Sequence, residues 1–392
     1  DAARSADYLL VDIKNFGSQQ FILREKMKLS LPFIVILHTV YDWFPVLCAI
    51  IPLLKEKDLV ISPSAYTKGS FLRLAARNKV HIMPLCMDIE KIQSQVLNKP
   101  AEKKGNIISF MGRLSPDRGI DVLIECMPQV IFEVRDSRLS IIGPLSGHLL
   151  RDIPRSDYVG RLMRKVEDSS LQGKVIFHGF KPSPEKYRIL SNSRVYVSAA
   201  THENFGIAVL EAMACGVPVI TTDSNASREL LSCGGAGYTY GCFYGRDGKF
   251  CHDRRRLVSL IVKILKDRQL GLRMGRRAMS LALRYDYRCV MPEFVKLLSA
   301  NKMRPGKGRF LSWDVLKDKR ISDFRPLFNR VVFRYLDMFG LGRLSYGDIY
   351  SRNGLIDQNP NLSCFTGSGG DRVYVKLMED ANRDLFRHLC FY

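Results

Sequence analysis

Short apolar runs separated by amphipathic stretches make up the first 97 residues. The runs are rich in β-branched residues and predict buried parallel strands at 7–13, 32–37, 57–64 and 79–85. Helices are expected between them, at 18–30 and 67–77. Strands that alternate with helices at this spacing are typical of βαβ units built on a parallel sheet.

A polar, lysine-rich stretch at 98–106 interrupts this pattern and predicts an interdomain linker. A second alternating series follows, with strands expected at 106–112, 138–144, 174–180, 194–199, 217–222 and 235–241. Helices are expected at 119–134 and 207–215, and a basic helical region at 253–283. The pattern therefore predicts an α/β protein with two Rossmann-like domains, at 1–97 and 107–300.

The two ends of the chain differ from these series. The first series opens with a strand at Asp7, without the glycine-rich strand-to-helix turn with which a doubly wound half usually begins. We therefore expect the N-terminal domain to lack its first strands. Residues 301–392 are rich in Arg, Phe and Gly and show no repeat, and we treat them as a C-terminal extension of unknown role.

The segment 198–223 holds the most informative pattern. A strand ends at Ala199, the loop THENFG follows, and an almost wholly apolar helix runs to Gly216. Loops beyond the carboxyl ends of strands are where α/β sheets bind ligands. The start of a helix favours an anion there, and Gly206 lets the backbone approach a ligand closely.

Two carboxylates and two guanidinium groups are the candidate binding and catalytic groups. Glu203 lies in the loop, and Glu211 lies two helical turns further on, in an apolar helix where a carboxylate needs a donor. A ribose diol and an ion pair with a nearby Arg both satisfy that need, and both stay open. Arg113 and Arg118 lie at another strand-to-helix turn, where they suit two phosphates or form part of an ordinary polar loop.

These residues resemble the paired-glutamate motif of retaining GT-B glycosyltransferases of family 4 (glycosyl transferases group 1). The matching positions are Glu203, Asn204, Phe205, Gly206 and Glu211, with Asn204 standing where the family usually carries Gly. The resemblance implies that Glu203 binds the donor hexose and Glu211 the ribose, while the backbone amides of 204–206 face the sugar and phosphate.

The resemblance extends to three further positions. It implies that Arg113 and Arg118 hold the pyrophosphate, Arg118 standing where the family has Lys. It also implies that His38, at the end of the strand at 32–37, faces the donor sugar near the reacting carbon. Without the resemblance, a His that ends an apolar strand is more often structural.

The reaction expected from these residues depends on positioning and electrostatics. No carboxylate is clearly placed as a general base, which suits a retaining route in which the leaving phosphate helps to take the acceptor proton. The chain has no Asp-x-Asp motif, so we expect no metal requirement. Cys233, Cys242, Cys251 and His252 match the spacing of no zinc module.

The composition indicates the kind of partner and the cellular compartment of the protein. Sixty Lys and Arg against 39 Asp and Glu give a net charge of +21, which favours polyanionic partners. The 10 cysteines form no CxxC pair and fit a reducing compartment. The longest apolar stretch, 31–54, is broken by three prolines and is not a spanning helix. We expect a cytoplasmic protein that can associate peripherally with an anionic membrane face.

The sequence thus favours a retaining glycosyltransferase that moves a hexose-type sugar from a nucleotide diphosphate sugar to a hydroxyl acceptor, such as a lipid-linked or anionic glycan. Two alternatives stay open: a catalytically silent nucleotide-sugar-binding module and a GT-B-like sugar-nucleotide epimerase. A nucleic-acid-binding function would rest on charge alone, since no recognition module is visible.

Overall fold

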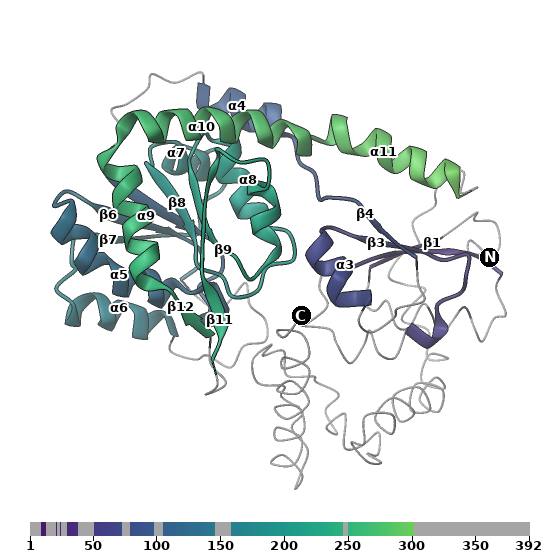
Figure 1. The fold of residues 1–392 in the computed structure, drawn as a ribbon, viewed down its shortest axis with the longest axis horizontal. Coiled ribbons are helices and arrows are strands. Elements are labelled where there is room, and N and C mark those ends of the chain that lie inside the picture. The colour runs from purple at the N-terminus through teal and green to yellow at the C-terminus, as the bar shows by residue number, and fades with distance from the viewer. Residues whose placement is uncertain are drawn as a thin grey trace, which may run out of the picture. The chain divides into compact units, whose positions relative to one another are not determined.

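The structure is a computed structural model that describes residues 9–12, 21, 24, 30–37, 51–72, 79–97, 105–145, 158–245 and 250–301. Its contacts divide the chain into two units, Asp1–Met83 with Glu293–Tyr392, and Pro84–Pro292. Each unit contains a parallel sheet (Figure 1), which confirms the predicted α/β class. His38, most of the expected linker and all but one residue of the expected extension lie outside the described residues.

The first unit contains a four-stranded parallel sheet in the order β1-β2-β3-β4. Its strands are β1 (Leu9–Asp12), β2 (Phe33–Ile36), β3 (Leu59–Ser62) and β4 (Val80–Ile82), one for each expected run. Helix α3 (Ala65–Leu72) follows β3, and a short 3-10 turn, η2 (Ile51–Leu53), precedes it. Of the helix expected at 18–30, the structure describes Phe21 and Arg24, both helical and fully buried.

A buried ion pair joins this helix to the sheet. Arg24 Nη1 lies 2.5 Å from Asp58 Oδ1, and Arg24 Nη2 donates to the Leu53 carbonyl at 2.6 Å. Asp58 also accepts from the backbone amides of Phe33 (2.8 Å) and Lys55 (2.8 Å). Buried charges of this kind require such partners, and this pair was not predicted from the sequence.

The second unit is built on a six-stranded parallel sheet in the order β10-β9-β8-β5-β6-β7. Its strands are β5 (Ile107–Met111), β6 (Arg138–Ile142), β7 (Val175–Gly179), β8 (Val195–Ser198), β9 (Val219–Thr222) and β10 (Gly237–Tyr240). All six expected strands of this series are therefore present. The order reverses between β5 and β8, as in doubly wound sheets with a ligand site at that point.

Helices cover both faces of this sheet (Figure 1). In β8, Val195 and Val197 pack with α5 (Ile120–Glu133), α6 (Tyr158–Asp168) and α9 (Arg254–Lys266). Tyr196 points to the other face and packs with α4 (Ile89–Leu97), α7 (Glu185–Ser191), α8 (Ile207–Ala214) and α10 (Arg268–Ala282). Because side chains of a strand alternate between faces, a strand buried on both sides reads as a continuous apolar run.

The basic helical region expected at 253–283 consists of two helices, α9 and α10. Helix α9 ends before Asp267. The Asp267 side chain accepts a hydrogen bond from the Leu270 amide at 2.8 Å and caps the start of α10. An Asp favours such a cap over a helix interior. The short η6 (Leu283–Tyr285) and α11 (Tyr287–Ala300) then follow α10.

Smaller elements complete the second unit. They are η3 (Pro116–Arg118), η5 (Ala226–Leu231) and the antiparallel hairpin β11 (Cys242–Tyr244) and β12 (Phe250–His252). Among the helices in the described ranges, none combines the length and apolar character needed to cross a bilayer.

Candidate functional site

The candidate site lies where the strand order of the second sheet reverses. The loop after β5, with η3, carries Arg113 and Arg118, and the loop after β8 carries Glu203. Since β5 and β8 are parallel neighbours, both loops leave the sheet at the same edge. The structure thus brings together the two segments that the sequence analysis selected separately.

Backbone and side-chain contacts join these loops. The Thr201 amide donates to the Asp117 carbonyl at 3.0 Å, and the Thr201 hydroxyl donates to it at 3.3 Å. Arg118 Nη1 lies 2.5 Å from Glu203 Oε2. Gly119 allows the close approach, because its φ is 64° and a Cβ there would lie 2.2 Å from the Ala199 carbonyl oxygen.

Arg118 is a partly buried cation with unused hydrogen-bonding capacity. Burial lowers the pKa of Arg118, but the charges of Glu203 and Asp117 outweigh this and raise it above its ordinary value. Its Nε lies 3.2 Å from Asp117 Oδ2 but makes no hydrogen bond within the described structure. The guanidinium is therefore always charged and is held in place by two carboxylates.

Arg113 is the more exposed of the two arginines. Its side chain is 40% exposed, and Nη2 lies 3.7 Å from Asp117 Oδ2. Asp117 Oδ2 therefore lies near both guanidinium groups of this loop.

The loop from Glu203 to Gly206 is fixed against its neighbours. The Glu203 carbonyl accepts from the Ala226 amide at 2.9 Å, and Glu203 Oε1 accepts from the Asn204 amide at 3.2 Å. Phe205 is buried and packs edge-on against Tyr285. Gly206 caps α8 with a φ of 102°, in the left-handed region that favours glycine.

Glu211 lies in α8 and is 6% exposed. Its Oε1 lies 2.6 Å from Lys186 Nζ and accepts from the Tyr187 hydroxyl at 3.0 Å. Burial raises the pKa of Tyr187, and the adjacent Glu211 charge raises it further, so the phenol stays a donor. The sequence left open a ribose diol and an Arg as partners of Glu211. In the structure Glu211 forms an ion pair with Lys186 instead of an Arg.

Lys186, Tyr187 and Asn225 were missed by the sequence analysis. Asn225 is fully buried and donates to the Ala200 carbonyl (2.8 Å) and the Thr222 hydroxyl (2.7 Å), and it accepts from the Ser227 amide (2.9 Å). An Asn directly before ASRELL is a recognisable cap signal. Lys186 and Tyr187 open the helix after β7, so their position beyond a strand of the same sheet was the available signal.

Tyr196 lies between the two glutamates in the buried layer. Its hydroxyl donates to the Met111 carbonyl at 3.1 Å, which ties β8 to the end of β5. Burial raises the pKa of Tyr196, and the charges of Glu203 and Glu211 act in the same direction. Tyr196 is therefore a neutral support under the site.

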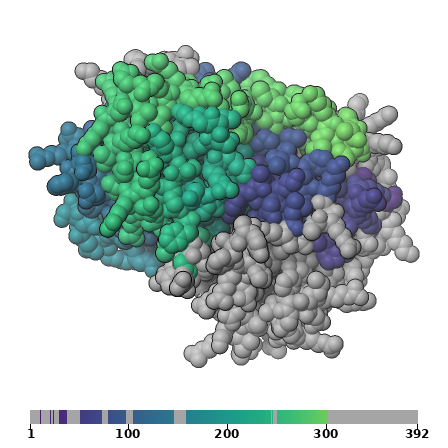
Figure 2. All heavy atoms as spheres, in the orientation of Figure 1, coloured from purple at the N-terminus to yellow at the C-terminus, as the bar shows by residue number. Residues whose placement is uncertain are grey.

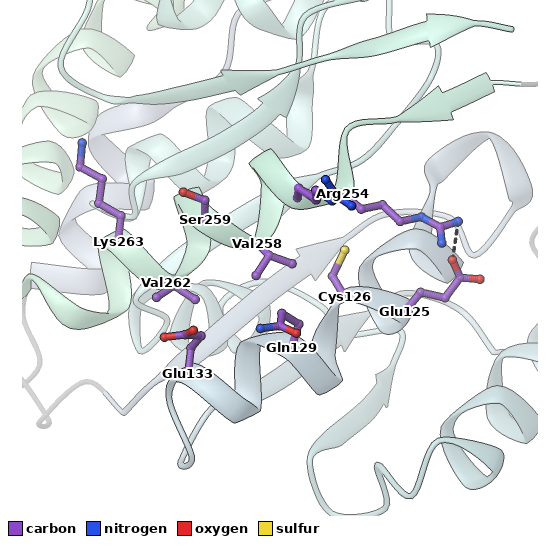
Figure 3. A pocket seen from close by; sticks show the side chains of 10 residues that line it. Glu125, Cys126, Gln129, Glu133, Arg254, Val258, Ser259, Val262 and Lys263 are labelled. Atoms are coloured by element: carbon purple, nitrogen blue, oxygen red, sulfur yellow. Dashed lines mark ion pairs between the residues drawn. The ribbon is translucent and has the colours of Figure 1, made fainter.

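A groove of about 660 Å³ lies elsewhere on this unit, between α5 and α9 (Figure 3). It is lined by residues of these two helices, including Cys126, Arg254 and Glu125, and by none of the predicted site residues. Glu125 is already paired with Arg254 at 2.6 Å and with Lys165. Over the described ranges, no group of three or more His, Cys, Asp or Glu side chains could hold a metal ion.

Comparison with known proteins bears on the same unit. Residues 92–280 match the model of the family described as Glycosyl transferases group 1. The match covers a little under half of the 392 residues.

Two curated relatives match over longer stretches. The poly(glycerol-phosphate) alpha-glucosyltransferase of Bacillus subtilis is 23% identical over 281 residues, which are 67% of this chain and 38% of that protein. The phosphatidyl-myo-inositol mannosyltransferase of Mycolicibacterium smegmatis is 25% identical over 219 residues, which are 55% of this chain and 50% of that protein. The chain thus spans half or less of the length of these relatives.

A solved structure matches a larger part of the chain. Anabaena Alr3699/HepE in complex with UDP has a TM-score of 0.60 at 20% identity, covering 75% of this chain and 79% of that chain. This likeness concerns the fold alone, and it confirms the expected α/β fold of GT-B type.

Proposed function

We propose that this chain is a retaining glycosyltransferase that moves a hexose-type sugar from a nucleotide diphosphate sugar to a hydroxyl acceptor. The observation that carries the proposal is the Arg118–Glu203 pair at the reversal point of the second sheet. The match of residues 92–280 to the group 1 family and the names of the curated relatives support a transferase.

The donor occupies the edge formed by the loops after β5 and β8. Arg113 and Arg118 bind the diphosphate through charge-assisted hydrogen bonds, and the amides of Asn204 to Gly206 at the start of α8 face the sugar and phosphate. Glu203 binds the hexose, and Glu211 accepts from the ribose hydroxyls. Lys186 and Tyr187 keep Glu211 oriented for that contact.

Catalysis rests on stabilising the leaving diphosphate while the acceptor hydroxyl attacks from the same face. Charge that develops on the diphosphate is met by Arg118, Arg113 and the α8 N-terminus, which are in place before the reaction. The departing phosphate oxygen helps to take the acceptor proton. By its resemblance to the family, we assign His38 to a contact with the donor sugar, and we propose that the reaction needs no metal.

The acceptor is proposed to be a phosphate-bearing or lipid-linked glycan. The net charge of +21 supports an anionic acceptor. Two of the curated relatives are named for poly(glycerol-phosphate) and phosphatidyl-myo-inositol, both of which carry phosphate. The same charge supports peripheral contact with an anionic membrane.

The test is a transfer assay with UDP-, GDP- and ADP-hexoses, followed by NMR assignment of the anomeric configuration of the product. We expect an α-linked product from an α-linked donor. Glu203→Gln should lower turnover about 100-fold or more, as for loss of a group acting in the transition state, and the exposed Glu167→Gln should not.

Each alternative gives a different outcome in this assay. An inverted anomer overturns the retaining route. Donor binding without turnover points to the silent binding module, and sugar conversion without any acceptor points to the epimerase.

A further inference from the structure

Helix α10 presents an exposed basic face on the second unit. Its buried side, which contains Met274, Ala278 and Leu281, packs in the two cores of the unit. The other half of the helix is exposed and carries Arg268, Arg273, Arg276 and Arg277. Green atoms of this helix and of α9 form part of the surface seen in Figure 2.

The exposed side chains fall into two rows along the helix axis. Arg268, Leu272 and Arg276 follow one another at intervals of four residues and form the first row. Leu283 continues this row into η6. Leu272 is 37% exposed and Leu283 39%, so two leucines lie among the arginines.

The second row consists of Arg273, Arg277 and Arg284. Arg277 approaches the carbonyls of Cys233 and Gly234 at 3.4 Å, and Arg284 Nη1 lies 3.0 Å from Cys233 Sγ. Among the described residues, no carboxylate forms an ion pair with any arginine of the two rows. The helix contains no acidic residue of its own.

Asp267 caps the start of α10, but the charged side chains along the exposed face itself are all arginines. Surface arginines are usually interspersed with carboxylates, which limits any single-sign field. Here the positive potential is directed outward over the length of α10. A partner surface with closely spaced negative charges would match the charge of this helix face.

We propose that the exposed face of α10 docks onto an anionic lipid surface. The arginines contact lipid phosphates, and Leu272 and Leu283 enter the headgroup region. The leucines favour a bilayer over a soluble polyanion, because a polyanion in water offers no apolar layer to receive them. The inference rests on this helix alone and not on the identity of the donor or acceptor.

The experiment measures partitioning of the full chain onto vesicles made of equal parts phosphatidylcholine and phosphatidylglycerol. Each arginine near an anionic surface contributes about a fivefold gain in partitioning. The triple variant Arg268→Gln/Arg273→Gln/Arg276→Gln should therefore partition at least about tenfold more weakly. A matched control, Arg161→Gln/Arg255→Gln/Arg256→Gln, removes the same charge from exposed positions on α6 and α9.

Leu272→Asn distinguishes the lipid surface from a soluble polyanion. It should weaken vesicle binding and leave binding to heparin unchanged. Circular dichroism and nucleoside diphosphate binding should match the wild type for every variant, because these side chains are exposed and lie outside the donor site.

Three results would overturn the proposal. One is an equal loss in the triple variant and its control, which indicates diffuse attraction by the net charge. Another is wild-type vesicle binding by Leu272→Asn together with tight heparin binding, which indicates a soluble polyanion. The third is absence of vesicle binding by the wild type.

Discussion

Glu211 is a buried carboxylate whose charge is compensated by two neighbours before any ligand arrives. Lys186 supplies the opposite charge and Tyr187 a hydrogen bond, and both meet the same oxygen, Oε1. The second oxygen is left to accept from a ligand, because a carboxylate has lone pairs on both. We therefore propose that Lys186 positions Glu211 for a ligand.

Lys186→Met tests this role. The substitution keeps the aliphatic stem but leaves Glu211 without its cation, so we expect nucleoside diphosphate binding to weaken about tenfold, as for loss of a hydrogen bond to a charged group. The same titration with the 2′-deoxynucleotide should show a much smaller difference between variant and wild type. Calorimetry gives both dissociation constants.

The deoxynucleotide separates positioning from other effects of the substitution. A penalty of equal size with both nucleotides would mean that Lys186 does not act through a contact between Glu211 and the ribose. Arg161→Met, on the exposed face of α6, is the control for loss of one positive charge.

At the scale of elements, α4 depends on a residue far away in the sequence. Asp286 is buried and accepts from the amides of Ile89 (2.8 Å) and Glu90 (3.2 Å) at the start of this helix. Burial alone would raise the pKa of Asp286, but hydrogen bonds from the backbone amides of Arg288, Glu90 and Ile89, together with the Arg288 charge, lower it below its usual range. The folded state therefore favours the ionised form.

Asp286→Asn is predicted to remove an acid-dependent part of the stability. A carboxyl whose pKa is lowered on folding stabilises the protein above its unfolded pKa, and this contribution is lost as the pH falls through the folded value. The wild type should therefore be more stable than the variant at neutral pH, by about 1–2 kcal/mol for loss of a charged cap. Urea denaturation at several pH values should show the gap closing toward pH 3.

The exposed Asp168→Asn serves as the control for the acid series. Its stability should follow that of the wild type at every pH. A gap for Asp286→Asn that stayed constant down to pH 3 would contradict a cap dependent on ionisation.

The strands and helices differ in how far the sequence predicts them. The strands of both sheets were predictable, because buried parallel strands are continuous apolar runs bounded by turns. Helix α4 was not predicted, although Asp88, directly before it, accepts from the Lys91 amide at 3.1 Å and is a local cap. The second acceptor at its start, Asp286, lies 197 residues from Ile89 and could not be inferred from the sequence. The break at Asp267 was missed because the basic, amphipathic pattern continues across it.

The candidate site could be predicted only in part from the sequence. Arg118 and Glu203 could be placed together because loops after parallel strands share one edge of a sheet. Lys186 could not, because the sequence does not show which of several polar residues near a third loop faces Glu211. The location of the candidate site follows from a general property of α/β sheets, whereas the contacts around Glu211 follow from packing.

At the scale of the whole molecule, the two units have different means of stabilisation. The second unit buries two large apolar clusters, one on each face of its sheet. Among its described residues, the first unit buries an apolar cluster on each face of its sheet and contains the fully buried Arg24, paired with Asp58. Removing one partner of a buried pair leaves a charge without compensation.

Asp58→Asn should therefore destabilise the first unit selectively. The expected cost is about 3–5 kcal/mol, seen as reduced hydrogen-exchange protection of the amides in β2 and β3. The amides of β8 and β9 should keep their protection, and nucleoside diphosphate binding should be preserved. Glu56→Gln, at an exposed position nearby, should change neither sheet. Equal loss of protection in both sheets would show that the units unfold as one.

The central claim, that a nucleotide diphosphate lies at the edge formed by β5 and β8, is tested most directly by calorimetric titration. UDP, GDP and ADP are titrated into the wild type, Arg118→Gln and the control Arg161→Gln. We predict that at least one of them binds the wild type and the control equally well, and binds Arg118→Gln about tenfold or more weakly. Binding of none of the three, or equal binding to Arg118→Gln, would contradict the account.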